Sequence, residues 1–394
     1  MRAAAASALL LAGLVLGCSA DFGNVLVECF SECSLPNAQG ICVQGQCHVL
    51  ACERGFGDCN ASVGDGCEVS LLDDPASCGY CGNGCSAGCA GGSCHPLEVL
   101  STELGAPYAP LAIGADDVYA AVGSSAAGGA LIRVPKAGGA VEVLARVGEL
   151  ALAANADEAF VYWLEAARFD ELLGFALRAV PVTGGEPREL AAGSGVPAES
   201  VVLLGGRAYL DVEGPMGPSY STVLAASALE PDLGPVPVLE LAGRVFGLQS
   251  DGRRLIFGYR GVSTDLLAIS GTGMDGSVLA TRFRPSTFAL DVQRVYFSTS
   301  GGRDVTPLFE LELETGSERR LGAVPFTPRA IVARGDAVYL VDSRRGGLAR
   351  YVRDTGAVEL IAGEQGVLSN VVFDEDSAYF AARGQILRLA LRAP

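Results

Sequence analysis

Cysteine is the residue type whose number and spacing carry the most chemistry in this chain. All but one of the 13 cysteines lie within residues 29–94, and none follows Cys94. Cysteines at this density pair as disulfides or ligate a soft metal such as zinc. Because the remaining twelve are an even number, we expect six disulfides. The cysteines concerned are Cys29, Cys33, Cys42, Cys47, Cys52, Cys59, Cys67, Cys78, Cys81, Cys85, Cys89 and Cys94.

A zinc site is the first alternative for the end of this region. Zinc binds four soft ligands in tetrahedral geometry, and one stretch offers closely spaced thiols beside a histidine. The candidate ligands are Cys78, Cys81, Cys85, Cys89 and His95. In an exported chain, where disulfides persist, the even cysteine count favours bridges over zinc.

A calcium site is the second alternative. Calcium takes six or more oxygen ligands, and the region offers four oxygen-bearing side chains, from Asp58, Asn60, Asp65 and Asp73. The spacing of an EF-hand loop is absent, because Val63 stands where that loop has its glycine. We therefore expect no metal here, and calcium-dependent adhesion stays open as a minor alternative.

Most side chains that enzymes use for acid–base or metal chemistry are missing beyond residue 95. His48 and His95 are the only histidines, and Lys136 is the only lysine. Imidazole bases and histidine-ligated metals are therefore excluded from residues 96–394, and we expect no cofactor there. Chemistry that needs only two carboxylates, as in glycosidases, remains possible.

The overall charge restricts the class of partner. The formal net charge is −17, with 45 acidic and 28 basic side chains. Nucleic acids and anionic lipid surfaces are bound through cationic patches, so we expect neither as a partner. An envelope protein or a glycan remains as the partner class.

The first residues resemble the signal of a bacterial lipoprotein. Arg2 is followed by the apolar stretch Ala3–Leu16, which is too short to span a bilayer. The next residues complete Val15-Leu16-Gly17-Cys18, which resembles a lipobox. That resemblance implies a signal peptide at 1–17, cleavage before Cys18, acyl chains on Cys18, and a short acylated tether at 18–28. Ser19 rather than Asp follows the cysteine, which in related systems implies the outer membrane, facing the periplasm or the cell surface.

A second resemblance covers part of the cysteine-rich module, residues 29–94. The motifs are Asp58-Cys59-Asn60, Asp65-Gly66-Cys67-Glu68, Leu72-Asp73 and Cys78-Gly79-Tyr80-Cys81-Gly82. They are similar to a cysteine-rich repeat of bacterial surface lipoproteins. The resemblance implies a small disulfide-rich domain and brings no defined activity.

An aromatic residue recurs after residue 110 at intervals of about 40 to 50 residues, the repeat length of four-stranded propeller blades. It stands at Tyr119, Tyr162, Tyr209, Phe257, Tyr296, Tyr339 and Tyr379. Alternating apolar residues and Gly or Asp turns place it in the second of four short strands. The sequence thus predicts an all-β fold, a seven-bladed β-propeller, with six or eight blades as alternatives.

The two ends of the repeat region complement each other. The last repeat stops after a third strand, and the stretch 97–103 resembles the fourth strands of other repeats. We expect this stretch to complete the last blade, so that residues 95–394 form a closed ring without exposed sheet edges at the closure. Among known families, these repeats look most like exported TolB-like propellers.

The loops between second and third strands are the candidate ligand-binding face. They are long and variable, and loops on a rigid scaffold often carry binding. Their polar candidates are Arg168, Asp170, Glu171, Tyr220, Arg303, Asp304, Arg344 and Arg345. The opposite face has tight turns with recurring acids, at Asp117, Asp157, Asp291, Asp336 and Asp376. Aspartate caps its own backbone in such turns, so we expect these acids to be structural.

These features predict a membrane-anchored, exported lipoprotein that acts as a non-enzymatic binding platform in the cell envelope. The alternative is an enzyme, a carboxylate- or metal-dependent hydrolase that acts on glycans or lactones. No catalytic residues are assigned.

Overall fold

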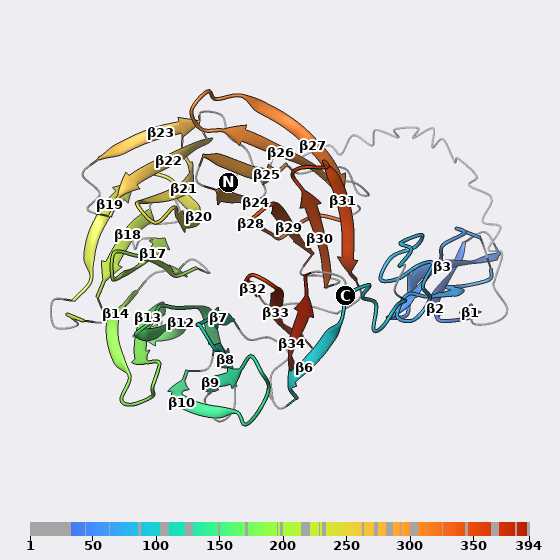
Figure 1. The fold of residues 1–394 in the computed structure, drawn as a ribbon, viewed down its shortest axis with the longest axis horizontal. Coiled ribbons are helices and arrows are strands. Elements are labelled where there is room, and N and C mark those ends of the chain that lie inside the picture. Colours follow the sequence, from blue (N-terminus) through green and yellow to red (C-terminus); the bar gives the residue numbers. More distant parts are fainter. Residues whose placement is uncertain are drawn as a thin grey trace, which may run out of the picture.

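The structure is a computed structural model with two parts, a ring of β-sheets and a small module beside it (Figure 1). It describes residues 33–43, 45–62, 64–85, 88–102, 110–122, 129–148, 150–169, 172–194, 196–197, 200–213, 221–227, 229–230, 234–261, 264–271, 275–280, 287–291, 293–299, 306–324, 326–342, 346–363, 370–382 and 384–391. Every regular element in these ranges is a β-strand. None of the described segments forms a helix with the length and apolar composition needed to cross a bilayer.

Seven sheets surround the ring axis, and each is a propeller blade. Blade one consists of β7 (Leu111–Ile113), β8 (Asp117–Val122), β9 (Gly129–Pro135) and β10 (Glu142–Val147), and blade two of β11 (Leu150–Ala156), β12 (Phe160–Phe169), β13 (Leu172–Pro181) and β14 (Arg188–Ser194). Blade three consists of β15 (Val196–Pro197), β16 (Val202–Leu204), β17 (Arg207–Glu213), β18 (Ser221–Ala226) and β19 (Val236–Leu241). Blade four consists of β20 (Arg244–Ser250), β21 (Arg254–Arg260), β22 (Thr264–Ser270) and β23 (Gly276–Ala280).

Three further blades complete the ring and confirm the expected seven-bladed propeller. Blade five consists of β24 (Thr287–Asp291), β25 (Arg294–Ser298), β26 (Thr306–Glu312) and β27 (Glu318–Val324), and blade six of β28 (Ala330–Arg334), β29 (Ala337–Asp342), β30 (Gly347–Val352) and β31 (Ala357–Ala362). Blade seven consists of β32 (Val371–Phe373), β33 (Ser377–Ala382), β34 (Gln385–Ala390) and β6 (Leu97–Ser101).

Blade seven combines both ends of the propeller chain. β6 runs antiparallel to β34, with Leu97 opposite Leu389 and Val99 opposite Leu387. The outermost strand of the last blade therefore comes from the start of the propeller. Unfolding blade seven requires the two ends of the propeller to separate.

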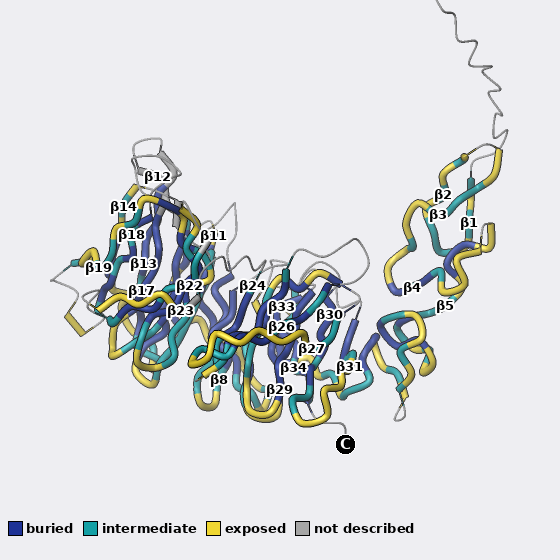
Figure 2. Tube along the Cα trace, turned by 90° about the horizontal axis from the view of Figure 1, so that it is seen from above, coloured by how far each residue is buried: buried dark blue, intermediate teal, exposed yellow. Residues whose placement is uncertain are grey.

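The core lies between neighbouring sheets rather than inside one central cluster. In Figure 2 buried residues run along the strands and exposed ones gather at the turns. The central strands are apolar on both faces because each blade packs between two others; β29 and β33 are buried at every residue. All seven recurring aromatics are buried, and Phe257 and Tyr296 are fully inaccessible. Six of them face the following blade, so the repeat visible in the sequence is the repeat of the inter-blade core. Phe257 is the exception: it faces the preceding blade three, and Ile256 beside it faces blade five.

A turn aspartate holds the aromatic in two of the blades. Asp157 accepts hydrogen bonds from the main-chain N–H of Phe160 at 2.7 Å and from the Tyr162 hydroxyl at 3.0 Å. In blade seven the same pattern joins Asp374 to Tyr379, at 2.8 Å. The structural role expected for Asp157 is confirmed, whereas in blade seven the capping residue is Asp374 and not Asp376.

The cysteine-rich module is described from Cys33 onward. It has a three-stranded sheet of β1 (Ser34–Leu35), β2 (Ala38–Val43) and β3 (Gln46–Cys52), and a two-stranded sheet of β4 (Phe56–Gly57) and β5 (Val69–Ser70). Disulfides join Cys33 to Cys47, Cys52 to Cys67, Cys59 to Cys81, Cys78 to Cys89, and Cys85 to Cys94. Cys42 is also disulfide-bonded, while Cys29 lies outside the described residues.

The disulfides decide between the two interpretations of the cysteines. The sulfurs of Cys78, Cys85 and Cys94 lie within 4.8 Å of one another, as in a metal site. Each of them is nevertheless bonded to sulfur, as is Cys81. A disulfide sulfur has no thiolate charge to offer a metal, so the zinc alternative is wrong. The disulfide-rich module is confirmed for the five described bridges, while the pairing of Cys29 stays a prediction.

Candidate binding trough between the cysteine-rich module and blade six

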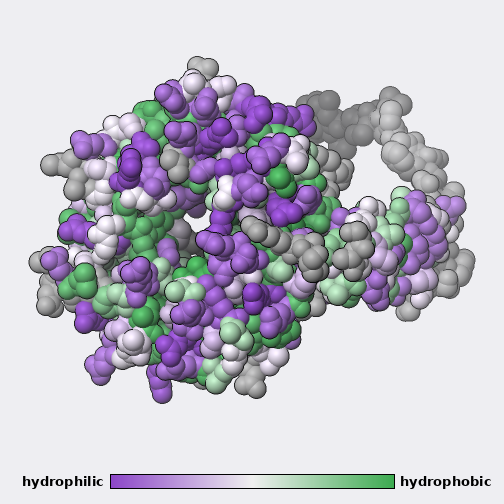
Figure 3. Space-filling model, viewed as in Figure 1, coloured by the Kyte–Doolittle hydropathy of each residue, from purple (hydrophilic) through white to green (hydrophobic). Residues whose placement is uncertain are grey.

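The predicted ligand-binding loops fall outside the part of the chain that the structure describes. Asp170, Glu171, Tyr220, Arg303, Asp304, Arg344 and Arg345 are not described, and for Arg168 only the backbone is, at the end of β12. These residues stay predictions, as does acylation of Cys18. The ring face shown in Figure 3 carries many hydrophilic residues around a hollowed centre.

The described residues form a different candidate site where the module meets blade six. The module reaches the outermost strand β31 through a β-bridge between Ser93 and Ala362. The main-chain N–H of Cys94 donates to the carbonyl of Ile361 at 3.1 Å, and that of Gly363 donates to the carbonyl of Gly92 at 2.9 Å. The module therefore begins a fifth strand on blade six.

Tyr80 anchors the module in the propeller core. Its ring stacks on Phe326 at 6.0 Å between centroids, and it packs against the apolar cluster between blades five and six. Two glycines make room for it: a Cβ on Gly347 would lie 1.8 Å from the Tyr80 hydroxyl, and one on Gly363 would lie 2.7 Å from its ring. Glycine is therefore required at both positions for this contact, because a side chain on either would clash with Tyr80.

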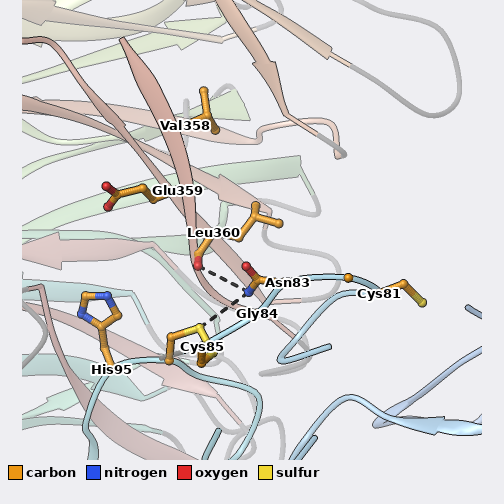
Figure 4. Close-up of a pocket in the computed structure, with 10 residues that line it drawn as sticks. Cys81, Asn83, Gly84, Cys85, His95, Val358, Glu359 and Leu360 are labelled. Carbon is orange, nitrogen blue, oxygen red and sulfur yellow. Dashed lines mark hydrogen bonds between the residues drawn. A yellow bond between two sulfur atoms is a disulfide. The ribbon is translucent and has the colours of Figure 1, made fainter. Parts of the chain in front are cut away.

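One pocket of about 430 Å³ lies between the module and β31 (Figure 4). Its wall on the propeller side is the outer edge of β31. Asn83 lines this pocket and links the module to β31, donating to the carbonyl of Cys78 at 2.7 Å and to that of Leu360 at 3.5 Å. The lining residues are Cys81, Gly82, Asn83, Gly84, Cys85, Cys94, His95, Val358, Glu359 and Leu360.

A second pocket of about 510 Å³ adjoins the first on the module side. The two pockets share Cys81 and Leu360 in their linings and are therefore neighbours; we name them together the junction trough. The second pocket is lined by Leu50, Ala51, Cys52, Glu53, Arg54, Phe56, Gly57, Asp58, Leu71, Gly79, Tyr80, Cys81 and Leu360.

Two carboxylates of the trough differ in whether they have a partner: Glu359 has one, and within the described part of the chain Asp58 lacks a hydrogen bond to one of its oxygens. The Glu359 carboxylate is engaged by Arg350, whose Nη2 lies 2.5 Å away. Burial alone would lower the pKa of Arg350, but the hydrogen bond and charge of Glu359 raise it above its ordinary value. By contrast, Oδ1 of Asp58 is buried and has no hydrogen-bond partner among the described residues. Such atoms are rare in folded proteins, and this oxygen retains an unused capacity to accept a hydrogen bond.

Two of the four residues considered for calcium, Asn60 and Asp65, belong to one hydrogen-bonded turn on the exposed side of the module. Asn60 donates from Nδ2 to Asp65 at 3.1 Å, and its Oδ1 accepts from the main-chain N–H of Ser62 at 2.7 Å.

Sequence reasoning missed the junction trough, because its walls come from distant parts of the chain. Asn83 and Leu360 are 277 residues apart. One signal was available: Tyr80 is an aromatic placed between two cysteines in a module that has few apolar residues. An aromatic there needs an apolar partner outside the module.

The sequence matches no protein-family model and no curated protein. Among solved structures, an oligogalacturonate lyase from Vibrio parahaemolyticus superimposes with a TM-score of 0.53 at 8% identity, covering 76% of this chain and 97% of that one. An oligogalacturonate lyase in complex with manganese gives a TM-score of 0.51 at 11% identity, covering 70% and 85%. The computationally designed Ika8 protein gives 0.50 at 12%, covering 74% and 99%. At such identities the likeness is one of fold alone.

Proposed function

We propose that this protein is an exported lipoprotein, held in the outer membrane by acyl chains on Cys18, whose propeller is a non-catalytic binding platform. The lipobox-like stretch Val15–Cys18 supports the anchor. The disulfides support a location outside the cytoplasm, where they persist. The partner is an envelope protein or a glycan.

The observation that carries the proposal is the rigid attachment of the module to blade six. A chain that only keeps a domain near a membrane can be a flexible linker. Here the module pairs with β31 and inserts Tyr80 between blades five and six. This attachment fixes the orientation of the ring relative to the described part of the module and creates the junction trough, which suits a platform that presents a binding surface.

The propeller fold gives only weak support to the enzyme alternative. The lyases share the propeller at 8% and 11% identity, and propellers host many unrelated functions. In the trough, His95 and Glu359 are the groups closest in type to an acid–base pair. The Glu359 carboxylate is already engaged in an ion pair with Arg350, and among the described residues no second carboxylate lines the same pocket.

The anchor is tested by replacing the acylated residue. We expect wild-type protein to fractionate with membranes and to carry added lipid mass on a chain that begins at Cys18. Cys18→Ala should shift the protein to the soluble fraction with unchanged disulfide content, measured by intact mass after alkylation. A wild-type chain without lipid mass, or a membrane-bound Cys18→Ala variant, would overturn the anchor.

The binding role is tested by photo-crosslinking in the producing cells. A benzoylphenylalanine replaces Leu50, which is 62% exposed in the trough; the matched control replaces Val278 on β23, which is 58% exposed. We expect a defined adduct from the first site and none from the second. Equal adducts from both sites would contradict a binding role for the trough, and turnover of glycoside or lactone substrates by the purified protein would favour the hydrolase alternative.

A further inference from the structure

The geometry points to one kind of occupant for the junction trough: an extended, positively charged peptide segment of a partner protein. Its backbone adds to the outer edge of β31, and one of its basic side chains reaches Asp58. This inference names the partner of the binding platform and therefore rests on the proposed function.

The first support is the outer edge of β31. β31 is the last strand of its sheet, and the module pairs with it at Ile361–Gly363. Among the described residues, no strand covers the edge N-terminal to Ile361, where Val358, Glu359 and Leu360 form the trough wall. An exposed strand edge is a template for an added strand, and its main-chain groups give affinity without requiring a particular sequence.

The second support is the shape of the trough. Two neighbouring pockets meet at Cys81 and Leu360, and an extended chain can reach into both where a compact ligand would fill one. Its module side is apolar at Leu50, Phe56 and Tyr80. In an added strand alternate side chains point to opposite sides, so apolar residues can face these walls while the residues between them face the charged groups.

The third support is Asp58. Its buried Oδ1 lacks a hydrogen-bond partner among the described residues, and it lines the module side of the trough. Guanidinium and ammonium groups are the donors that best complement a carboxylate. The described module also carries six acidic residues against Arg54 as its single arginine or lysine, so a basic segment is attracted over a longer range. The acidic residues are Glu53, Asp58, Asp65, Glu68, Asp73 and Asp74.

The inference is tested with full-length protein and a fluorescent peptide of alternating arginine and valine, followed by anisotropy at physiological salt. We expect saturable binding that Asp58→Asn weakens about tenfold, the effect of losing one charge-assisted hydrogen bond. The matched control is Asp73→Asn, which makes the same charge change at an exposed site. It should change the affinity less than about twofold.

Two altered peptides test strand addition and charge. Methylating every second backbone nitrogen blocks one edge of the added strand and should abolish binding, as should replacing each arginine by glutamate. Binding that survives methylation, equal binding of the glutamate peptide, or equal loss in Asp58→Asn and Asp73→Asn would overturn the inference. A crosslinked envelope partner at Leu50 together with a silent arginine peptide would leave the platform standing and refute only its basic-peptide partner.

Discussion

The cysteine-rich module and the propeller are built on opposite principles. In the described module the buried apolar residues are Cys67, Leu71 and Cys78, so sulfur makes up most of its small core. In the propeller the core continues between all neighbouring blades and contains no cysteine. Small domains cannot bury enough apolar area to offset chain entropy, whereas a closed ring of seven sheets can. Covalent bridges are therefore essential in one part and unnecessary in the other.

The propeller joins its blades by polar side chains that bind the backbone of the next blade. Gln249 on blade four accepts from the N–H of Leu290 and donates to the carbonyl of Phe288 on blade five. Asn370 forms the same two-way contact with Leu111, linking blade seven to blade one. These contacts are individually weak and reversible, so the propeller depends on many of them acting together. The module depends on a few strong bonds.

Reducing the disulfides should give the largest difference in stability between the module and the propeller. Each bridge contributes typically about 2–4 kcal/mol to stability, so the reduced module is expected to unfold completely. The blades should keep their cooperative unfolding transition, because no cysteine lies beyond Cys94. Hydrogen exchange read by mass spectrometry should show full loss of protection in residues 33–94 and retained protection in β8, β21 and β29. Loss of protection throughout the ring would mean that the propeller depends on the module.

A cavity in the propeller should give the next largest effect. Trp163 is fully buried between blades one and two, and its indole N–H donates to Glu165 at 3.2 Å. Trp163→Ala should cost about 3–5 kcal/mol in the free energy of unfolding, measured by circular dichroism in urea. Trp163→Phe should cost less, because it keeps most of the apolar volume. The disulfide content should stay unchanged in both variants; incomplete disulfides would show that the two parts do not fold independently.

The propeller could be predicted from the sequence because its repeat records a physical requirement. Residues such as Tyr162, Tyr296 and Tyr379 each face the next blade and fill equivalent inter-blade positions, so most blades supply an aromatic ring at the same place. In blade four that position is taken by Ile256, which faces blade five, while Phe257 faces blade three. Which aspartate caps each turn could be predicted only in part. Asp374 and Asp376 both fit a capping turn by type, and the choice of Asp374 depends on its reach to the Tyr379 hydroxyl.

The candidate site could not be predicted in the same way. The disulfide cysteines were identified by number, but their pairing depends on how the chain folds around them. The trough forms where Gly363 and Gly347 of blade six leave space for Tyr80, which lies more than 250 residues earlier. A single sequence does not distinguish a glycine that makes room for a distant aromatic ring from a glycine in a turn or at the end of a strand.

The junction itself can be broken from the propeller side. A Cβ on Gly363 would lie 2.5 Å from the carbonyl oxygen of Gly79, a backbone atom that cannot move without shifting the module. Gly363→Ala should therefore cost about 1–3 kcal/mol and expose β31 and residues 79–94 to hydrogen exchange. Gly276→Ala on β23 is the matched control, since its Cβ would have a contact of 3.8 Å. Unchanged exchange at β31 in Gly363→Ala would refute the rigid attachment.

The smallest effect concerns one hydrogen bond near the ring closure. Burial alone would raise the pKa of Asp374, but hydrogen bonds from Tyr379 and Lys136 lower it below 3.8. Burial, with the hydrogen bond to Asp374, raises the pKa of Tyr379 from 10.0 to about 12. Tyr379→Phe should cost about 1 kcal/mol near neutral pH, in urea unfolding.

The pH dependence gives this prediction its sign. A raised tyrosine pKa means that the folded state favours the protonated hydroxyl, so its contribution is complete below pH 10 and is lost as the pH rises through about 12. The difference in stability between wild type and Tyr379→Phe should therefore shrink across that range. At the acid end, the contribution of Asp374 is present above pH 3.8 and is lost as the pH falls through its lower folded pKa. A difference that stays constant from neutral pH to about pH 12 would show that the Phe variant loses packing and not the hydrogen bond to Asp374.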